Sequence, residues 1–251
     1  FRSFHERWYT KNNMTFVIYG PTTSEEVKPL VEKYLDPIPA RRIPQRGWLD
    51  ALRAFAPMDE AMFVEDPETK RTEVYLQRIV RYPDEDASAT SAVNTILFDY
   101  LNSRIKGSLS DVFVENSQIA TSVHVSATAL GAGVMWFTIS ATLEEGVDPA
   151  PLKGAFESFL TDLKARGVDE ATVNRLKRRR TVEIADAGKE PQRALSALTN
   201  WFFAARSYAD WGLRAKNYED VTPAKVQKMI DIMASPGRQL FGVLAPKGAA
   251  E

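Results

Sequence analysis

Apolar residues recur at helical spacing on both sides of a short joint in the middle of the chain, residues 102–108. They are Ile96, Leu97, Tyr100 and Leu101 before the joint, and Leu109, Val112 and Phe113 after it. An apolar, β-branched run follows and reaches Val123. This pattern predicts a helix, a joint, a second helix and a strand, with both helices against a sheet. Gly107 gives the joint the backbone freedom to turn.

Residues 1–40 follow the pattern helix, strand, helix. Residues 14–20, with the sequence MTFVIYG, predict a short apolar strand. Residues 22–35 start with an N-cap and acidic residues and predict a second helix. Its expected buried face consists of Val27, Leu30, Val31 and Tyr34. The prolines and arginines that follow predict an extended linker, which we place at residues 41–57.

After the linker, strands and helices are predicted in turn. Residues 61–66 and 72–82 predict two strands that the charged turn PETKR joins as a hairpin. The second strand alternates apolar and polar residues, although Arg78 stands at an apolar position. Further predicted elements are paired strands at 121–129 and 134–143, helices at 148–167, 168–187, 196–208 and 222–235, and a last strand at 239–246.

One pattern occurs twice: a helix, a polar break, an apolar strand and a Gly/Pro stop. It covers residues 3–21 and residues 226–246, with Gly20 and Gly237 at the strand boundaries. Both copies have the form of a domain ending. We therefore predict that residues 1–40 are the C-terminal tail of a preceding homologous domain, that 41–57 is a linker, and that 58–251 is one complete domain.

Composition narrows the class of protein. With 251 residues and 44% hydrophobic residues, the chain can bury a substantial core. Its net charge of −1 removes the electrostatic argument for nucleic acid or for an anionic membrane surface. The chain contains no cysteine, which excludes disulfides and thiolate zinc sites. Its apolar runs are shorter than the roughly 20 residues that cross a bilayer.

Four segments in a fixed order carry a resemblance to a known family. They are FHERWYTKNNMTFVIYGP, LFDYLNSRIKGSLSDVFVENSQIATSV, LEEGVDPAPLKGAFESFLTDLKARGVDEATVNRLKRR, and DVTPAKVQKMI with LFGVLAPKG. Together they resemble the insulinase/pitrilysin-like zinc metallopeptidases. The resemblance implies an α/β (α+β) fold, in which an antiparallel-rich mixed sheet has helices packed on one side. Such a unit is the half-domain of a clamshell that closes on an unfolded peptide.

In that family one half carries zinc through an inverted motif, H-x-x-E-H, with a further Glu from a later helix. The corresponding helix here, SATSAVNTILFDYLNS, contains neither His nor Glu. His5, beside Glu6, has no second His at helical spacing, and His124 stands alone in an apolar strand. We therefore expect no catalytic residue, metal ligand or cofactor in this chain, and zinc in the catalytic domain of the parent protein.

The non-catalytic half of the family would also carry an Arg and a Tyr that clamp substrate, in a stretch of the form L-R-E-E-x-G-L-A-Y. Aligning FVENSQIAT to that stretch places Val114 at the Arg position and Thr121 at the Tyr position. This departure favours the second quarter of a four-domain, single-chain member over the last quarter.

Three further groups have a functional and a structural interpretation. Arg104 in the joint is our candidate substrate-binding residue, although it would equally cap the preceding helix. The basic run 177–180 would grip a phosphate or acidic partner, but a solvated helix face is the more common role of such runs. Residues 201–203, Trp-Phe-Phe, favour core packing over a peptide pocket.

The leading hypothesis is that the chain is a non-catalytic domain of an insulinase-like zinc metallopeptidase. The domain would be inactive alone and would form part of the chamber that encloses the peptide substrate. The zinc site would lie elsewhere in the parent protein, a metalloendopeptidase. The alternative is a scaffold or assembly protein of the same fold without peptidase activity in any domain. A free-standing peptide-binding module is a third possibility. The expected partners are the catalytic half of the same polypeptide and a peptide substrate, with neither nucleic acid nor membrane. Residues 1–40 would also support a homodimer, and the resemblance implies a periplasmic or secreted protein.

Overall fold

A five-stranded mixed sheet forms the centre of the computed structural model, which describes residues 1–18, 20–43, 58–82, 87–131, 133–187, 189–205, 211–235 and 237–248. The strands are β1 (Met58–Asp66), β2 (Glu73–Arg81), β3 (Ala120–Gly131), β4 (Val134–Leu143) and β5 (Arg238–Pro246). Their order across the sheet is β1-β5-β2-β4-β3. Only the β1/β5 pair is parallel, and the other pairs are antiparallel. The expected antiparallel-rich mixed sheet is therefore confirmed.

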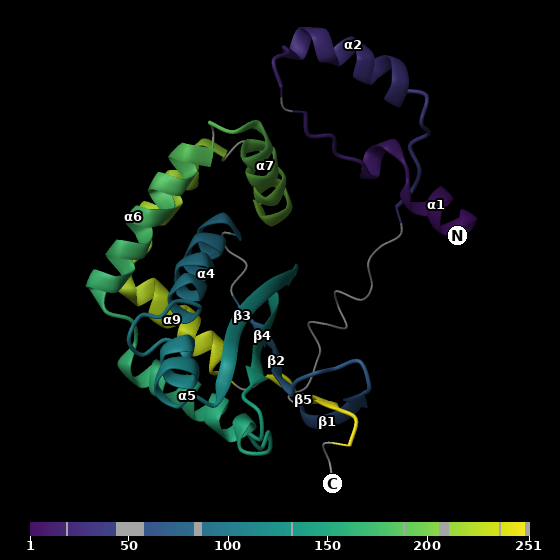
Figure 1. Ribbon diagram of the computed structural model, residues 1–251. Coiled ribbons are helices and arrows are strands. Elements are labelled where there is room, and N and C mark those ends of the chain that lie inside the picture. Colours follow the sequence, from purple (N-terminus) through teal and green to yellow (C-terminus); the bar gives the residue numbers. More distant parts are fainter. Residues whose placement is uncertain are drawn as a thin grey trace.

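Helices cover one face of this sheet (Figure 1). The helices in contact with the strands are α4 (Ala87–Leu101), α5 (Leu152–Arg166) and α9 (Pro223–Met233), together with a π-helix at Asp111–Asn116. A second set packs against α4: α6 (Glu170–Ala187), α7 (Pro191–Ala205) and α8 (Arg214–Glu219), the last preceded by a 3-10 turn at Trp211–Leu213. Alternate strand residues such as Leu76, Phe137 and Ile139 are fully buried against apolar helix residues such as Leu97 and Phe156. In the strands every second side chain faces the helices, and in the helices one apolar stripe faces the sheet. Helices can pack on a sheet only when these two apolar surfaces meet.

Local signals set the ends of several helices. At α9, the side chain of Thr222 accepts a hydrogen bond from the backbone N–H of Lys225, and Pro223 opens the helix. Helix α5 stops at Gly167, whose φ is +66°. Gly107 in the joint has a φ of +80°, as its expected turning role requires.

The predicted hairpin between residues 61–66 and 72–82 is wrong. Strands β1 and β2 form, but β5 lies between them and pairs with both. The reason is burial: Phe241, Val243 and Ala245 of β5 are nearly inaccessible to solvent, whereas the middle of β1 is exposed throughout. The more apolar C-terminal strand therefore takes the inner position.

Residues 1–43 stand apart from the sheet (Figure 1). They contain α1 (Arg2–Trp8), a 3-10 turn at Lys11–Asn13, and α2 (Ser24–Leu35) with a capping box between Thr23 and Glu26. Asn12 ties this unit together, since its side chain donates to the carbonyl of Arg41 at 2.9 Å and accepts from the N–H of Arg41 at 3.1 Å.

Two expectations for this unit are wrong. Residues 14–18 form no strand, because a strand needs a neighbour and the described residues place none beside them. Phe16 and Ile18 remain 54% and 53% exposed. The helix at 24–35 is present, but its apolar face is uncovered, with Leu30 at 56% and Tyr34 at 66% exposure. Gly237 directly precedes β5 as expected, whereas Gly20 borders no strand.

Candidate functional site

The joint after α4 places Arg104 in solvent. The Arg104 side chain is 81% exposed, and its Nε lies 3.2 Å from Oε1 of Glu115. The end of α4 is instead closed by Ser103, whose hydroxyl donates to the carbonyl of Tyr100 at 2.7 Å. Arg166 supports the joint by donating to the Tyr100 hydroxyl at 2.7 Å. The capping role of Arg104 is therefore taken by another residue, and its substrate-binding role stays a prediction.

Asn102, also in the joint, closes part of one sheet edge. Its side-chain amide donates to the carbonyl of Val125 at 2.8 Å and accepts from the N–H of Val125 at 2.7 Å. These are the two backbone groups that a further strand would use. Since β3 is the last strand on this side, Asn102 occupies the place of a neighbour at the middle of that edge.

Among the described residues, neither of the two histidines lies in a group that could bind a metal ion. His5 on α1 stacks on the ring of Tyr9, with 4.5 Å between centroids, and His124 lies on the exposed side of β3. No group of three or more His, Cys, Asp or Glu side chains in the described part of the chain could hold a metal ion. Val114 packs against the core, and the Thr121 hydroxyl donates to the carbonyl of Thr142 at 3.2 Å.

The basic run 177–180 is only partly a solvated face, so this expectation needs correction. Arg178 is exposed. Lys177, however, donates to the carbonyls of Glu219 and Val221 at 2.6 and 2.8 Å, at the end of α8. Arg180 donates to both carboxylate oxygens of Asp99 on α4, and that carboxylate is 11% exposed. These long-range acceptors make Lys177 and Arg180 structural, and Arg179 also reaches Asp99, with Nη2 3.4 Å from the carboxylate. The side chains of residues 201–203 lie outside the described set.

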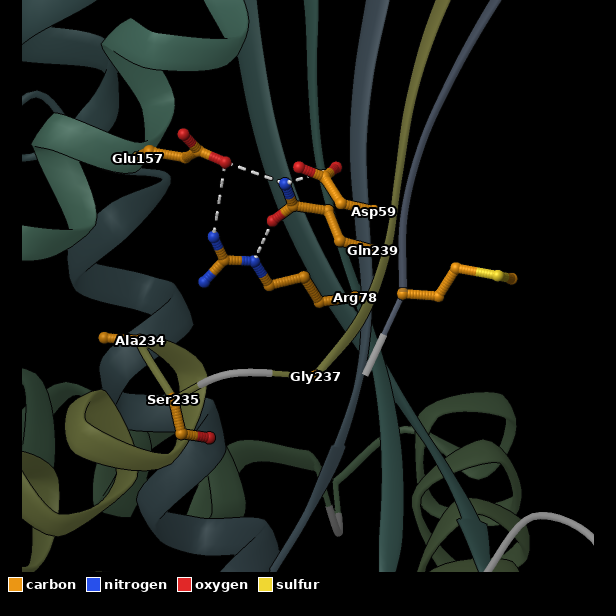
Figure 2. Close-up of a pocket in the computed structure, with 8 residues that line it drawn as sticks. Asp59, Arg78, Glu157, Ala234, Ser235, Gly237 and Gln239 are labelled. Carbon is orange, nitrogen blue, oxygen red and sulfur yellow. Dashed lines mark hydrogen bonds and ion pairs between the residues drawn. The ribbon is translucent and has the colours of Figure 1, made fainter. Parts of the chain in front are cut away.

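A cleft of about 410 Å³ opens where the sheet meets α5 and α9 (Figure 2). Its lining residues are Met58, Asp59, Arg78, Glu157, Ala234, Ser235, Gly237 and Gln239. The Arg78 guanidinium lies at its centre, with Nη1 donating to the Met233 carbonyl at 3.3 Å and Nη2 3.8 Å from Oε1 of Glu157. Nε donates to the side-chain oxygen of Gln239. The cation thus sits at the negative end of α9.

Gln239 and Lys153 extend this network to the edge of the sheet. The Gln239 amide donates to Glu157 at 2.7 Å and to Asp59 at 3.3 Å. Lys153 of α5 donates to the other oxygen of Asp59 at 2.6 Å, and this hydrogen bond lowers the pKa of the Asp59 carboxyl. Burial lowers the pKa of Arg78, against the opposing effect of Glu157 and Asp59. Two cations thus meet two carboxylates, and the network fastens β1 to the body of the domain.

Over β2, β4 and β3, the second face of the sheet carries mainly hydrogen-bonding side chains. Trp136 is 40% exposed there, and Tyr75 donates to the carboxylate of Glu73, which raises the pKa of the phenol to about 12. The other residues that alternate onto this face include Gln77, Thr138, Ser140, His124, Ser126 and Thr128. Hydroxyl, amide and aromatic groups together suit contacts with an unfolded backbone.

A family model described as "Peptidase M16 inactive domain" matches residues 1–180. The chain belongs to the peptidase M16 inactive domain family. The expected relation to the insulinase/pitrilysin-like peptidases, on their inactive side, is confirmed. No sequence among the curated proteins compared gives a significant match.

Solved structures share the fold of this M16 inactive domain. A protease from Helicobacter pylori has a TM-score of 0.78 at 13% identity, over 98% of this chain and 58% of that one. A peptidase M16 inactive domain from Pseudomonas fluorescens has a TM-score of 0.73 at 16% identity, over 99% and 57% of the two chains. The periplasmic protease PqqL from Escherichia coli has a TM-score of 0.66 at 16% identity, over 91% and 25%.

This M16 domain thus spans just over half of the Helicobacter pylori protease that it matches. No helix in the described residues is long and apolar enough to cross a bilayer.

Sequence reasoning missed the network around Arg78, although one signal was present: Arg78 occupies an inward-facing position between the buried residues Leu76 and Val80. A charged residue at such a position needs buried partners.

Proposed function

We propose that this chain forms part of the wall of a peptide-enclosing chamber and supports substrate binding for a zinc site located elsewhere in the parent protein. The observation that supports this proposal is a sheet face that no described helix covers and that carries Trp136, Tyr75 and several hydroxyl groups. The family to which the domain belongs is described as inactive. The catalytic half of the same polypeptide would supply the metal, and Arg104 would contact substrate. The description of PqqL as periplasmic supports a periplasmic or secreted parent.

This proposal predicts peptide binding without metal or hydrolysis. The dialysed chain should hold no stoichiometric zinc and leave peptides intact, because isolated histidines cannot complete a tetrahedral site. It should nevertheless bind unfolded casein peptides in an anisotropy titration. Trp136→Ala should weaken that binding by about 1 kcal/mol or more, as loss of an aromatic contact does.

The matched control is Val182→Ala, which removes an apolar side chain that is 59% exposed on α6, away from the sheet face. It should leave the affinity unchanged. One tightly held zinc per chain, or hydrolysis by this chain alone, would contradict the assignment. Absence of any peptide binding would instead favour the scaffold or assembly protein of the same fold.

We also propose that residues 1–40 are the tail of a preceding homologous domain, 41–57 a linker, and 58–251 the inactive domain itself. In support, no described residue of 1–43 belongs to the core cluster, whose members all lie between Val74 and Val243. The uncovered residues Phe16, Ile18, Leu30 and Tyr34 are then the side chains that the preceding domain would bury. Residues 44–57 lie outside the described residues.

Deleting residues 1–40 should therefore leave a domain that unfolds cooperatively, with a melting temperature close to that of the full chain. The intact chain should self-associate through its exposed apolar unit, and the deletion should reduce this association. Calorimetry and light scattering measure the two effects. Loss of cooperative unfolding on deletion would place residues 1–40 in the core of this domain and refute the boundary.

A further inference from the structure

Strand β1 is an open edge of the sheet. It pairs with β5 on one side, and no described segment pairs with the other side. Half of its peptide groups therefore point outward along nine residues. The opposite edge, on β3, differs because Asn102 closes it at Val125. Natural sheet edges are usually short, covered, interrupted by proline or charged. β1 contains no proline or lysine and no described segment covers its edge, so its acidic side chains are the feature that sets which strand can pair with it.

The centre of β1 is apolar on both faces. Met62 and Val64 point to the uncovered face and are 52% and 40% exposed, while Phe63 points to the helix side and is 48% exposed. Helix α5 reaches the start of this strand through Lys153, whereas α4 and α6 lie at the far side of the sheet from it (Figure 1). Three consecutive large apolar residues thus stand in solvent beside free backbone groups.

Negative charge flanks this apolar centre. β1 contains four acidic residues and no basic one: Asp59, Glu60, Glu65 and Asp66. Asp59 is engaged by Lys153 and Gln239, and Asp66 accepts hydrogen bonds from the turn residues Glu68 and Thr69. Glu60 and Glu65 are exposed and make no ion pair or hydrogen bond with any described residue. They stand on either side of the sequence Ala-Met-Phe-Val.

We propose that the outer edge of β1 binds an extended segment of a peptide substrate by strand addition, and selects segments with an apolar centre and lysine or arginine on both flanks. The inference rests on the proposed peptide-binding function and locates one docking place for it. Backbone groups of the peptide pair with β1, apolar side chains contact Met62, Phe63 and Val64, and basic flanks meet Glu60 and Glu65. Because both flanks of β1 are acidic, either strand direction satisfies the charges.

A second copy of the chain fits this edge poorly. Antiparallel pairing of two β1 strands about Met62 would put Asp59 of one copy opposite Glu65 of the other, at both ends of the pair. Like charges directly opposite each other destabilise a strand pair. A basic peptide replaces this repulsion by attraction. Charge complementarity thus favours a peptide over a homodimer at this edge.

The test is an anisotropy titration of the full chain with the labelled peptide Lys-Lys-Val-Phe-Val-Ile-Lys-Lys at low salt. The double variant Glu60→Lys/Glu65→Lys should bind it roughly tenfold more weakly, since both flanks of β1 change from attracting to repelling the lysines of the peptide. Glu144→Lys/Glu145→Lys, in the exposed turn after β4, changes the net charge equally and should stay within about twofold of the unchanged chain. The same peptide with alternate N-methylated amides should lose binding, because it cannot pair with a strand.

Equal weakening in both double variants, or undiminished binding of the N-methylated peptide, would overturn the inference. If casein peptides bind in a way that depends on Trp136 but not on Glu60 and Glu65, the β1 site is refuted and the proposed function stands. If the chain binds no peptide of either kind, both fail. Mass measurement during the titration shows whether one chain or two occupy the complex, and a dimer formed through β1 would also refute the proposal.

Discussion

Replacing Arg78 with methionine should lower the free energy of unfolding by about 3 kcal/mol. Methionine keeps an unbranched apolar stem, is two atoms shorter than arginine, and has no hydrogen-bond donor. The Gln239 oxygen, the Met233 carbonyl and the Glu157 carboxylate would then lose their shared cation. Because the Arg78 side chain is only 12% exposed, water reaches these acceptors poorly. Chemical denaturation of the variant and the unchanged chain measures the difference.

Arg193→Met is the matched control for this variant. Arg193 pairs with Glu190 at 2.9 Å, but the two side chains are 66% and 58% exposed. Its removal should cost less than about 1 kcal/mol, the usual range for surface ion pairs. If Arg78→Met were no more destabilising than Arg193→Met, the network at the cleft would be a surface feature and would not fasten β1.

Asp99→Asn should cost about 2 kcal/mol. The Asp99 carboxylate on α4 accepts from Arg180 through both oxygens and lies 3.4 Å from Nη2 of Arg179. The amide keeps the shape but offers one acceptor in place of two, and it turns an NH₂ group toward a guanidinium. Since this pair joins α4 to α6, its loss loosens the helix layer over the core. Thermal and denaturant unfolding both report the change.

Glu183→Gln is the matched control for Asp99→Asn, because it also removes one negative charge beside Arg179 and Arg180. Glu183 binds the same two arginines, with 2.6 Å to Arg180 and 3.2 Å to Arg179, but it is 45% exposed and lies on the same helix as both. Its replacement should cost less than about 0.5 kcal/mol. Equal losses for the two substitutions would mean that burial of Asp99 contributes nothing.

Local features of this fold could be predicted from the sequence, whereas distant pairings could not. Thr222 with Pro223, and Gly167 at the end of α5, act on the turn in which they stand, so sequence reasoning located these ends. The false hairpin has the opposite origin. PETKR has every property of a hairpin turn, but the strand that enters between its arms begins at residue 238.

The candidate site also has local features that could be predicted from the sequence and distant contacts that could not. The absence of H-x-x-E-H could be read directly from the sequence, whereas the partners of Arg78 and Arg180 lie 161 and 81 residues away along the chain. The inward position of Arg78 indicates that it needs buried partners, but it does not say which distant residues provide them. Residues 14–18 are a different case: their apolar pattern is that of a strand, but no neighbour for it stands in the described residues.

The Asn102 contact with Val125 also bears on assembly into fibres. A sheet with two free edges can stack head to tail without limit, because the β1 edge of one molecule meets the β3 edge of the next and the contact never closes on itself. Here the amide of Asn102 fills the position that an incoming strand would need at the middle of β3. The β3 edge of one molecule therefore cannot pair along its full length with the β1 edge of the next, which removes the head-to-tail contact from which a filament would grow.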